Sequence, residues 1–145
     1  MRMLIRVLGL AMVLGAAACS QAPSTQAPTA QSAAQTALDA LTPVIAAEIG
    51  APVTLQPATQ NVSGEWAYIV ARPANADGSA IDWSATNLAS RHENAVMDES
   101  GTVYALLRQE HGAWTVVEHV IAPTDVAWVD WAARHGVPAG VIGTP

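Results

Sequence analysis

The strongest constraint on the fold of this chain is a pair of strand-like runs that only two residues separate. The runs are TVYALLRQE, residues 102–110, and AWTVVEHVIA, residues 113–122. Between them stands His111-Gly112, a pair that favours the tight turn of a β-hairpin. The second run also alternates, with one expected face of Trp114, Val116, Glu118 and Val120 and another of Thr115, Val117, His119 and Ile121. The sequence therefore predicts an antiparallel hairpin.

A helical pattern stands before the strands, in TALDALTPVIAAEIG, residues 36–50. Apolar residues recur there at helical spacing, namely Leu38, Leu41, Ile45 and Ile49. Gly50 and Pro52 are typical of a helix end. Pro43 interrupts the pattern, so that either the helix kinks there or Thr42 caps a second helical segment.

Two further strands are expected between the helix and the hairpin. Residues 52–62 form a weak pattern in which Pro57 indicates an edge strand or a bulge. Residues 65–73, EWAYIVARP, form a strong one that ends in proline. A turn at Asp77-Gly78 follows, and then a long loop over residues 84–100 with one helical turn.

The C-terminal stretch PTDVAWVDWAARHG, residues 123–136, predicts a short helix. Asp125 is expected near its N-cap, and Gly136 and Pro138 provide the stop. Helical spacing places Trp128, Trp131 and His135 on one face. The fold class is therefore α+β, with an N-terminal helix packed on an antiparallel sheet of about four strands and a short C-terminal helix. This element order resembles cystatin-like and small NTF2-like folds.

The start of the chain has the pattern of an export signal. MRMLIR is basic, and the apolar run of about a dozen residues that follows is shorter than the ~20 residues a bilayer requires. Residues 1–18 are therefore predicted as a signal peptide. Cys19, the one cysteine, follows Ala16-Ala17-Ala18. This resembles a bacterial lipoprotein signal with lipidated Cys19, although Ala16 replaces the usual leucine. Ordinary cleavage that leaves a free thiol is the alternative.

The residues after Cys19 predict a flexible connection to one domain. Residues 19–35 are rich in Ala, Gln, Pro, Ser and Thr and carry no charge, which is typical of a tether. Residues 36–145 are long enough for a single α+β domain with its own core. Because Ser20 rather than Asp follows the cysteine, analogy with Gram-negative lipoproteins predicts the outer membrane, facing the periplasm. A soluble periplasmic or secreted protein is the alternative.

The charge of the chain argues against nucleic-acid partners. The sequence has no lysine, and its 12 acidic residues and 6 arginines give a net charge of −6. Phosphate backbones would repel such a chain. No glycine-rich phosphate loop, nucleophile elbow or zinc-ligand spacing occurs. The acidic stretch around His92 and the group Glu118, His119 and Asp125 are expected to be structural. We therefore predict no catalytic residue, no metal and no cofactor.

The sequence resembles a family of uncharacterised small secreted bacterial proteins. The likeness covers most of residues 38–142 and is carried by TPVIAAEIGAPV, GEWAYIVARP, DGSAIDW, VYALLR, WTVVEHVIAPTDVAWVDW and GVPAGV. It departs from the pattern at Ala122, where glycine is expected before Pro-Thr-Asp-Val. The resemblance implies a shared fold and export, and it implies no activity.

Three tryptophans are the candidate binding residues. Trp83, Trp128 and Trp131 are selected because tryptophan dominates binding hot spots. The alternative is that all three fill the core of a chain that lacks phenylalanine. The expected function is a lipid-anchored, non-catalytic binding module of the bacterial envelope, with a membrane anchor at Cys19 and a possible protein partner. A small periplasmic hydrolase and an inhibitor or immunity-type protein are the alternatives.

Overall fold

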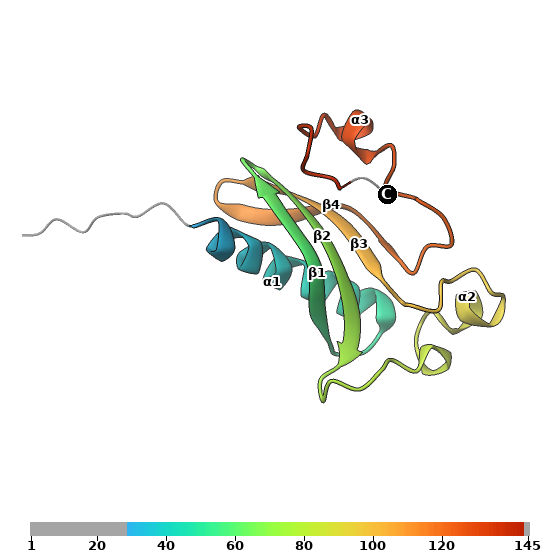
Figure 1. The fold of residues 1–145 in the computed structure, drawn as a ribbon. Coiled ribbons are helices and arrows are strands. Elements are labelled where there is room, and N and C mark those ends of the chain that lie inside the picture. Colours follow the sequence, from blue (N-terminus) through green and yellow to red (C-terminus); the bar gives the residue numbers. More distant parts are fainter. Residues whose placement is uncertain (1–28, 144–145) are drawn as a thin grey trace, which may run out of the picture.

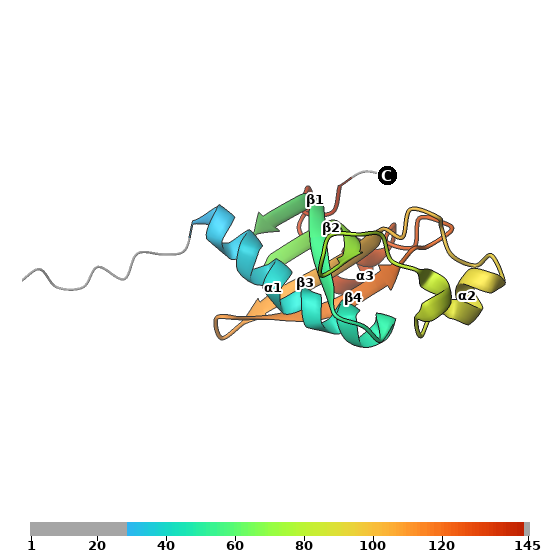
Figure 2. The same cartoon turned by 90° about the horizontal axis from the view of Figure 1, so that it is seen from below.

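A computed structural model describes residues 29–143 and shows a helix, a sheet and a C-terminal segment in three layers (Figures 1 and 2). The order is α1 (Ala30–Ile49), β1 (Val53–Ser63), β2 (Trp66–Asn75), the 3-10 helix η1 (Trp83–Ala85), α2 (Ala89–Glu93), β3 (Val103–Glu110), β4 (Ala113–Ile121) and α3 (Trp131–His135). The α1 helix packs on one face of the antiparallel sheet, and the segment with α3 packs on the other. The predicted α+β fold class is confirmed.

The sheet is a meander in which each strand pairs with its neighbour in sequence, in the order β1-β2-β3-β4. The predicted β3–β4 hairpin is confirmed, because His111 and Gly112 have φ angles of +52° and +83° and form the turn. The prediction for Pro57 is also confirmed. It lies on the edge strand β1, and the register with β2 shifts between Pro57 and Thr59.

The α1 helix begins six residues earlier than the predicted domain boundary. Thr29 caps it by accepting a hydrogen bond from the Ser32 amide, so residues 30–35 belong to the helix and not to the predicted tether. Alanine has the highest helix propensity, and it makes up half of these six residues. The helix continues through Pro43, so the separately capped segment does not form. The predicted signal peptide and the tether up to residue 28 lie outside the described residues.

The core between α1 and the sheet, here called the helix-face core, is formed as the helical spacing predicts. The four apolar residues predicted on α1 are each at most 7% exposed. They pack against small and branched side chains of the strands, with Leu55, Ala67, Ile69, Ala71, Val103, Ala105, Leu107 and Ile121 among them. At about 25 cal/mol per Å² of buried apolar surface, this layer supplies much of the hydrophobic stabilisation of the fold.

A second core lies on the opposite face, under the C-terminal segment, and is here called the second-face core. Its strand residues are the intervening ones of the same strands, chiefly Trp66, Tyr68 and Leu106. The covering residues are Trp131, Val137 and Val141. Because both faces of β2 and β3 are buried, these strands read as nearly continuous apolar runs.

The predicted alternation along β4 is wrong beyond Val116, because a bulge interrupts it. Leu107 pairs with Val116 and Leu106 with Glu118, so Val117 is left without a partner in β3. Trp114 and Val116 therefore pack toward α1, whereas Glu118 points to the other face. Because of the extra residue, Glu118 and His119 each lie on the face opposite to the one predicted for them.

The C-terminal helix is shorter than predicted. The α3 helix begins at Trp131 after Asp130, and residues 127–130 form turns, so Asp125 is not its N-cap. The predicted end is confirmed, because Gly136 has a φ of +67° and its amide donates to the Ala132 carbonyl. Trp128 and Trp131 consequently do not share one regular helix face.

Candidate functional site

The three tryptophans predicted as binding residues do not form one surface. Trp131 is 1% exposed and belongs to the second-face core. Trp128 is half-buried at the rim of that core. Trp83 is also half-buried, but it lies in η1 and packs against the helix-face core. Trp131 thus fits the alternative of a core residue, while Trp128 and Trp83 keep exposed ring surface in two separate places.

The turn that contains Trp128 carries exposed apolar side chains, and we call Tyr104, Val126, Trp128 and Val129 the Trp128 patch. The rings of Trp128 and Tyr104 are stacked, with centroids 3.8 Å apart and planes inclined by 10°. Val126 is 45% exposed and Val129 is 64% exposed. A hydrogen bond from the Val129 amide to the Val126 carbonyl fixes the turn between them. Two exposed valines and one oriented, half-buried indole therefore lie in the same turn.

A groove surrounds Arg72 at the end of the second sheet face, and no residue of the C-terminal segment lines it. Two separate hollows, of about 320 and 310 Å³, both have Gln56 and Arg72 in their lining. These two residues pair across β1 and β2, and both are exposed. We call this the open groove. Its further lining includes Trp83, Glu99, Ser100 and Thr102.

Two histidine–carboxylate pairs join β4 to the helices on either side of the sheet. On the α1 side, His119 Nε2 lies 2.6 Å from Glu48 Oε2. On the other side, His135 Nε2 lies 2.7 Å from Glu118 Oε2, and Arg134 lies 2.7 Å from the second oxygen of Glu118. The ionised carboxylates can only accept, so the imidazole N–H groups donate. The sheet separates the two pairs, so they do not form one acid–base site.

The acidic and histidine groups considered for metal binding do not converge. Within residues 29–143, no three side chains of His, Cys, Asp or Glu are placed to hold a metal ion. Asp98 accepts hydrogen bonds within its own turn from Ser100, and Asp82 does so from Ser84. These bonds lower the pKa values of both aspartates. Their role is to fix turns in the chain.

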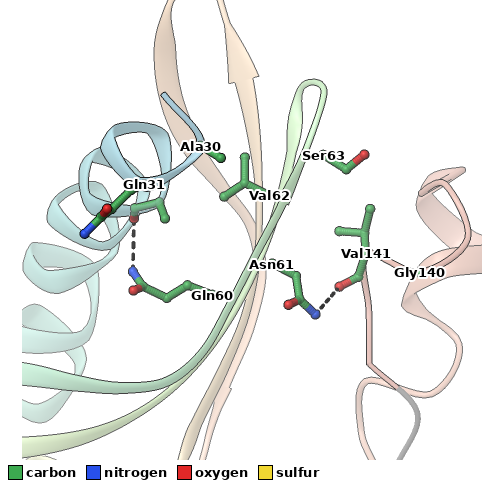
Figure 3. Close-up of a pocket in the computed structure, with 9 residues that line it drawn as sticks. Ala30, Gln31, Gln60, Asn61, Val62, Ser63, Gly140 and Val141 are labelled. Carbon is green, nitrogen blue, oxygen red and sulfur yellow. Dashed lines mark hydrogen bonds between the residues drawn. The ribbon is translucent and has the colours of Figure 1, made fainter. Parts of the chain in front are cut away.

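A hollow of about 510 Å³ lies beside the edge strand β1, between the start of α1 and the C-terminal segment. Gln60 and Asn61 are consecutive in β1 and point in opposite directions (Figure 3). Gln60 donates to the Ala34 carbonyl of α1 at 3.1 Å, and Asn61 donates to the Val141 carbonyl at 2.9 Å. The two amides thus fasten both outer layers to the sheet, which accounts for their presence without a ligand.

The contacts of Glu118 predict a pH-dependent contribution to stability. Burial raises the pKa of Glu118, but hydrogen bonds from His135 and Arg134 outweigh it, so the folded pKa lies below the usual 4.5. A lowered pKa stabilises the fold above the unfolded value, and this contribution is lost as the pH falls through the folded pKa. We expect Glu118→Gln to lower the free energy of unfolding by about 1 kcal/mol at pH 7.

Urea titrations at several pH values measure this effect. The difference between Glu118→Gln and the parent protein should shrink as the pH falls below 4.5. Glu110→Gln is the matched control, because Glu110 is 59% exposed and lies 3.8 Å from Arg108. This control should change the free energy of unfolding by less than about 0.5 kcal/mol at every pH tested. A loss for Glu118→Gln that is constant with pH would contradict the assignment.

Sequence reasoning did not select Arg72 or Gln56, which line the open groove. The available signal was the alternation of β2, in which Trp66, Tyr68, Val70 and Arg72 share one face. A charged residue at the end of an otherwise buried row indicates where the covering layer stops. The position of its partner Gln56 depends on the register of β1 and β2, which the sequence does not define.

No helix within residues 29–143 is both long and apolar enough to cross a membrane. The predicted Cys19 anchor and the export signal lie outside the described residues. Comparison with known proteins identifies no relative, since the chain matches no family model, no curated protein and no solved structure. The resemblance to small secreted bacterial proteins therefore remains a prediction.

Proposed function

We propose that this protein is an exported, lipid-anchored binding module of the bacterial envelope that binds a protein partner through the Trp128 patch. The observation that carries this proposal is the exposed turn with Val126 and Val129 beside Trp128. Solvent exposure of two neighbouring large apolar side chains costs free energy that a partner surface would recover. Tryptophan and tyrosine are also the side chains that interfaces favour.

The geometry around Trp128 supports binding because the surface is ordered in advance. Stacking on Tyr104 fixes the orientation of the indole. Trp131, three residues later, is fully buried and holds the turn against the sheet. An interface built on such residues loses little side-chain entropy when a partner binds. An ordered surface of this kind favours recognition of a folded protein. The two valines are exposed and therefore do not fill this protein's own core.

The placement of the titratable groups favours binding over hydrolysis. A hydrolytic site needs an acid and a base that face one reacting group. The pairs His119–Glu48 and His135–Glu118 point to opposite faces of the sheet and already hold helices in place. We therefore rank the binding module above a small periplasmic hydrolase. An inhibitor or immunity-type protein would be one form of the same module.

The anchor in this proposal rests on Cys19 and its resemblance to a lipoprotein signal. Because α1 begins at Ala30, the ten residues 20–29 would separate a lipidated Cys19 from the domain. Fully extended, ten residues span at most about 35 Å. The domain would then stay close to the outer membrane and meet partners at its surface. The mass of the mature N-terminal peptide tests this part, and an unmodified Cys19 would contradict it.

We expect Val129→Glu to abolish capture of the partner while the protein stays folded. The test is affinity capture from envelope extract with the full-length chain, followed by mass spectrometry of the retained proteins. A charge at a side chain that is 64% exposed should cost the fold little. In the centre of an apolar interface, the same charge would be buried without a partner, at a cost of several kcal/mol.

The matched control is Val96→Glu. Val96 is 52% exposed and lies beside α2, outside the Trp128 patch. The Val96→Glu variant has the same substitution and the same change of charge as Val129→Glu, and it should capture as much partner as the parent protein. If both variants retain the same proteins, or if the parent protein captures none, binding through the Trp128 patch is refuted.

A further inference from the structure

The open groove around Arg72 is lined by charged, polar and aromatic side chains that the packing of the fold does not require. Arg72 on β2 and Gln56 on β1 are cross-strand partners, and Trp83 and Glu99 belong to the segment between β2 and β3. None of these four residues belongs to the Trp128 patch, so a ligand in this groove would be independent of the proposed protein partner. Each of the two hollows lies at the lower end of the size range of small-molecule sites.

Arg72 is a cation without an acidic partner. Among the four arginines of residues 29–143, the other three each have a carboxylate oxygen within 4.0 Å. The structure shows no ion pair for Arg72, although the same residues contain 12 acidic side chains. In so acidic a domain, the Arg72 guanidinium is the group that is free to take an anion. Its planar N–H groups match a carboxylate in a bidentate contact.

Trp83 provides the apolar wall of the groove. Its ring lies directly against the backbone of Gly101, where an added Cβ would come within 2.5 Å of Cζ2. The tryptophan also packs against the helix-face core. These contacts hold the indole in place, and because Trp83 is only half-buried and lines the hollow, it offers aromatic surface to a ring-shaped ligand.

Glu99 is the acidic residue in the lining of the open groove. It lines the same hollow as Arg72, and among the described residues the structure shows no ion pair between the two. A carboxylate is a hydrogen-bond acceptor, so it suits hydroxyl groups on the ligand. Gln56 can donate and accept, and Ser100 lines the same hollow. The groove therefore combines an anion-binding group, an aromatic wall and acceptors for hydroxyl hydrogens.

We propose that the open groove binds a sugar acid, that is, a pyranose ring that carries a carboxylate. The Arg72 guanidinium would hold the carboxylate, Trp83 would stack on the C–H face of the ring, and Glu99 with Gln56 would bind the hydroxyls. Such a ligand uses all three features of the groove. A small anion such as acetate leaves Glu99 without a hydroxyl partner, and a neutral sugar leaves Arg72 unpaired.

The test is titration of the full-length protein with glucuronate, glucose and acetate, monitored by calorimetry and by the NMR signals of the indole N–H groups. Glucuronate should bind with a Kd on the order of 1 mM, as expected for so small a ligand. Glucose and acetate should each bind at least about tenfold more weakly. The Trp83 signal should shift, and the Trp114 signal, whose N–H donates to Thr36, should not.

Arg72→Gln should reduce glucuronate affinity to that of glucose, and because Arg72 is exposed the variant should fold. Arg108→Gln is the matched control, since Arg108 is paired with Glu65 and lies over Trp66. It should leave the affinity unchanged. Equal affinity of Arg72→Gln and the parent protein would overturn the proposal. Binding of acetate as tight as that of glucuronate, or shifts confined to signals other than Trp83, would also overturn it.

Discussion

Replacing Trp131 by alanine is expected to lower the free energy of unfolding by about 3–5 kcal/mol. Trp131 is 1% exposed and is the largest fully buried side chain in residues 29–143. It covers the row of strand residues that includes Trp66, Tyr68 and Leu106. Its removal would leave a large cavity between α3 and the sheet, and the five-residue helix has too few other contacts to close it.

Urea denaturation followed by circular dichroism measures this loss. The control is Trp128→Ala, the same substitution at a half-buried indole. It removes the stack on Tyr104 and should cost only about 1–2 kcal/mol. The two variants therefore separate a core tryptophan from a surface tryptophan. A loss below about 1 kcal/mol for Trp131→Ala would show that the second-face core does not stabilise the fold.

Gly101→Ala is expected to destabilise the protein by about 2–5 kcal/mol. Gly101 has a φ of +65°, a conformation that costs any residue with a Cβ about 1–2 kcal/mol. The new methyl group would also come within 2.5 Å of the Trp83 ring. Because Trp83 also packs against the helix-face core, its ring cannot move away without disturbing that packing.

Gly136→Ala separates these two causes. Gly136 has a nearly identical φ of +67°, and no atom lies within 4 Å of an added Cβ. It should therefore show the backbone cost alone, about 1–2 kcal/mol. Thermal unfolding of both variants gives the difference, which reports the contact with Trp83. Equal losses for the two variants would mean that the Trp83 ring is free to shift.

The fold class could be predicted because its signals are local. His111-Gly112 defines a turn by backbone conformation alone, and both φ angles are positive as the turn requires. Pro57 lacks an amide hydrogen and is restricted to an edge or a bulge in any sheet. The spacing of Leu38 to Ile49 identifies the buried side of α1 whatever that side packs against.

The sequence-based predictions were wrong or incomplete where tertiary contacts determine the local structure. The sequence Thr124-Asp125 has the chemistry of a helix start, yet the stacking of Trp128 on Tyr104 accompanies turns there, and α3 begins only at Trp131. Likewise, Arg72 and Trp83 are 11 positions apart and come together only because the loop after β2 returns to the sheet. Neither contact has a signature within a short window of sequence.

The extra residue in β4 makes the length of this strand as important as its composition. With Val117 unpaired, Glu118 reaches the C-terminal segment while His119 reaches α1. If β4 continued through Val117 without the bulge, regular alternation would exchange the two sides and direct Glu118 into the layer beneath α1. Loss of Val117 should therefore leave Glu118 on its present face, whereas an added residue before position 118 should be tolerated far less than one in the loop after β2. Related genes with one more residue before position 118 would need a changed polarity pattern from 118 to 121.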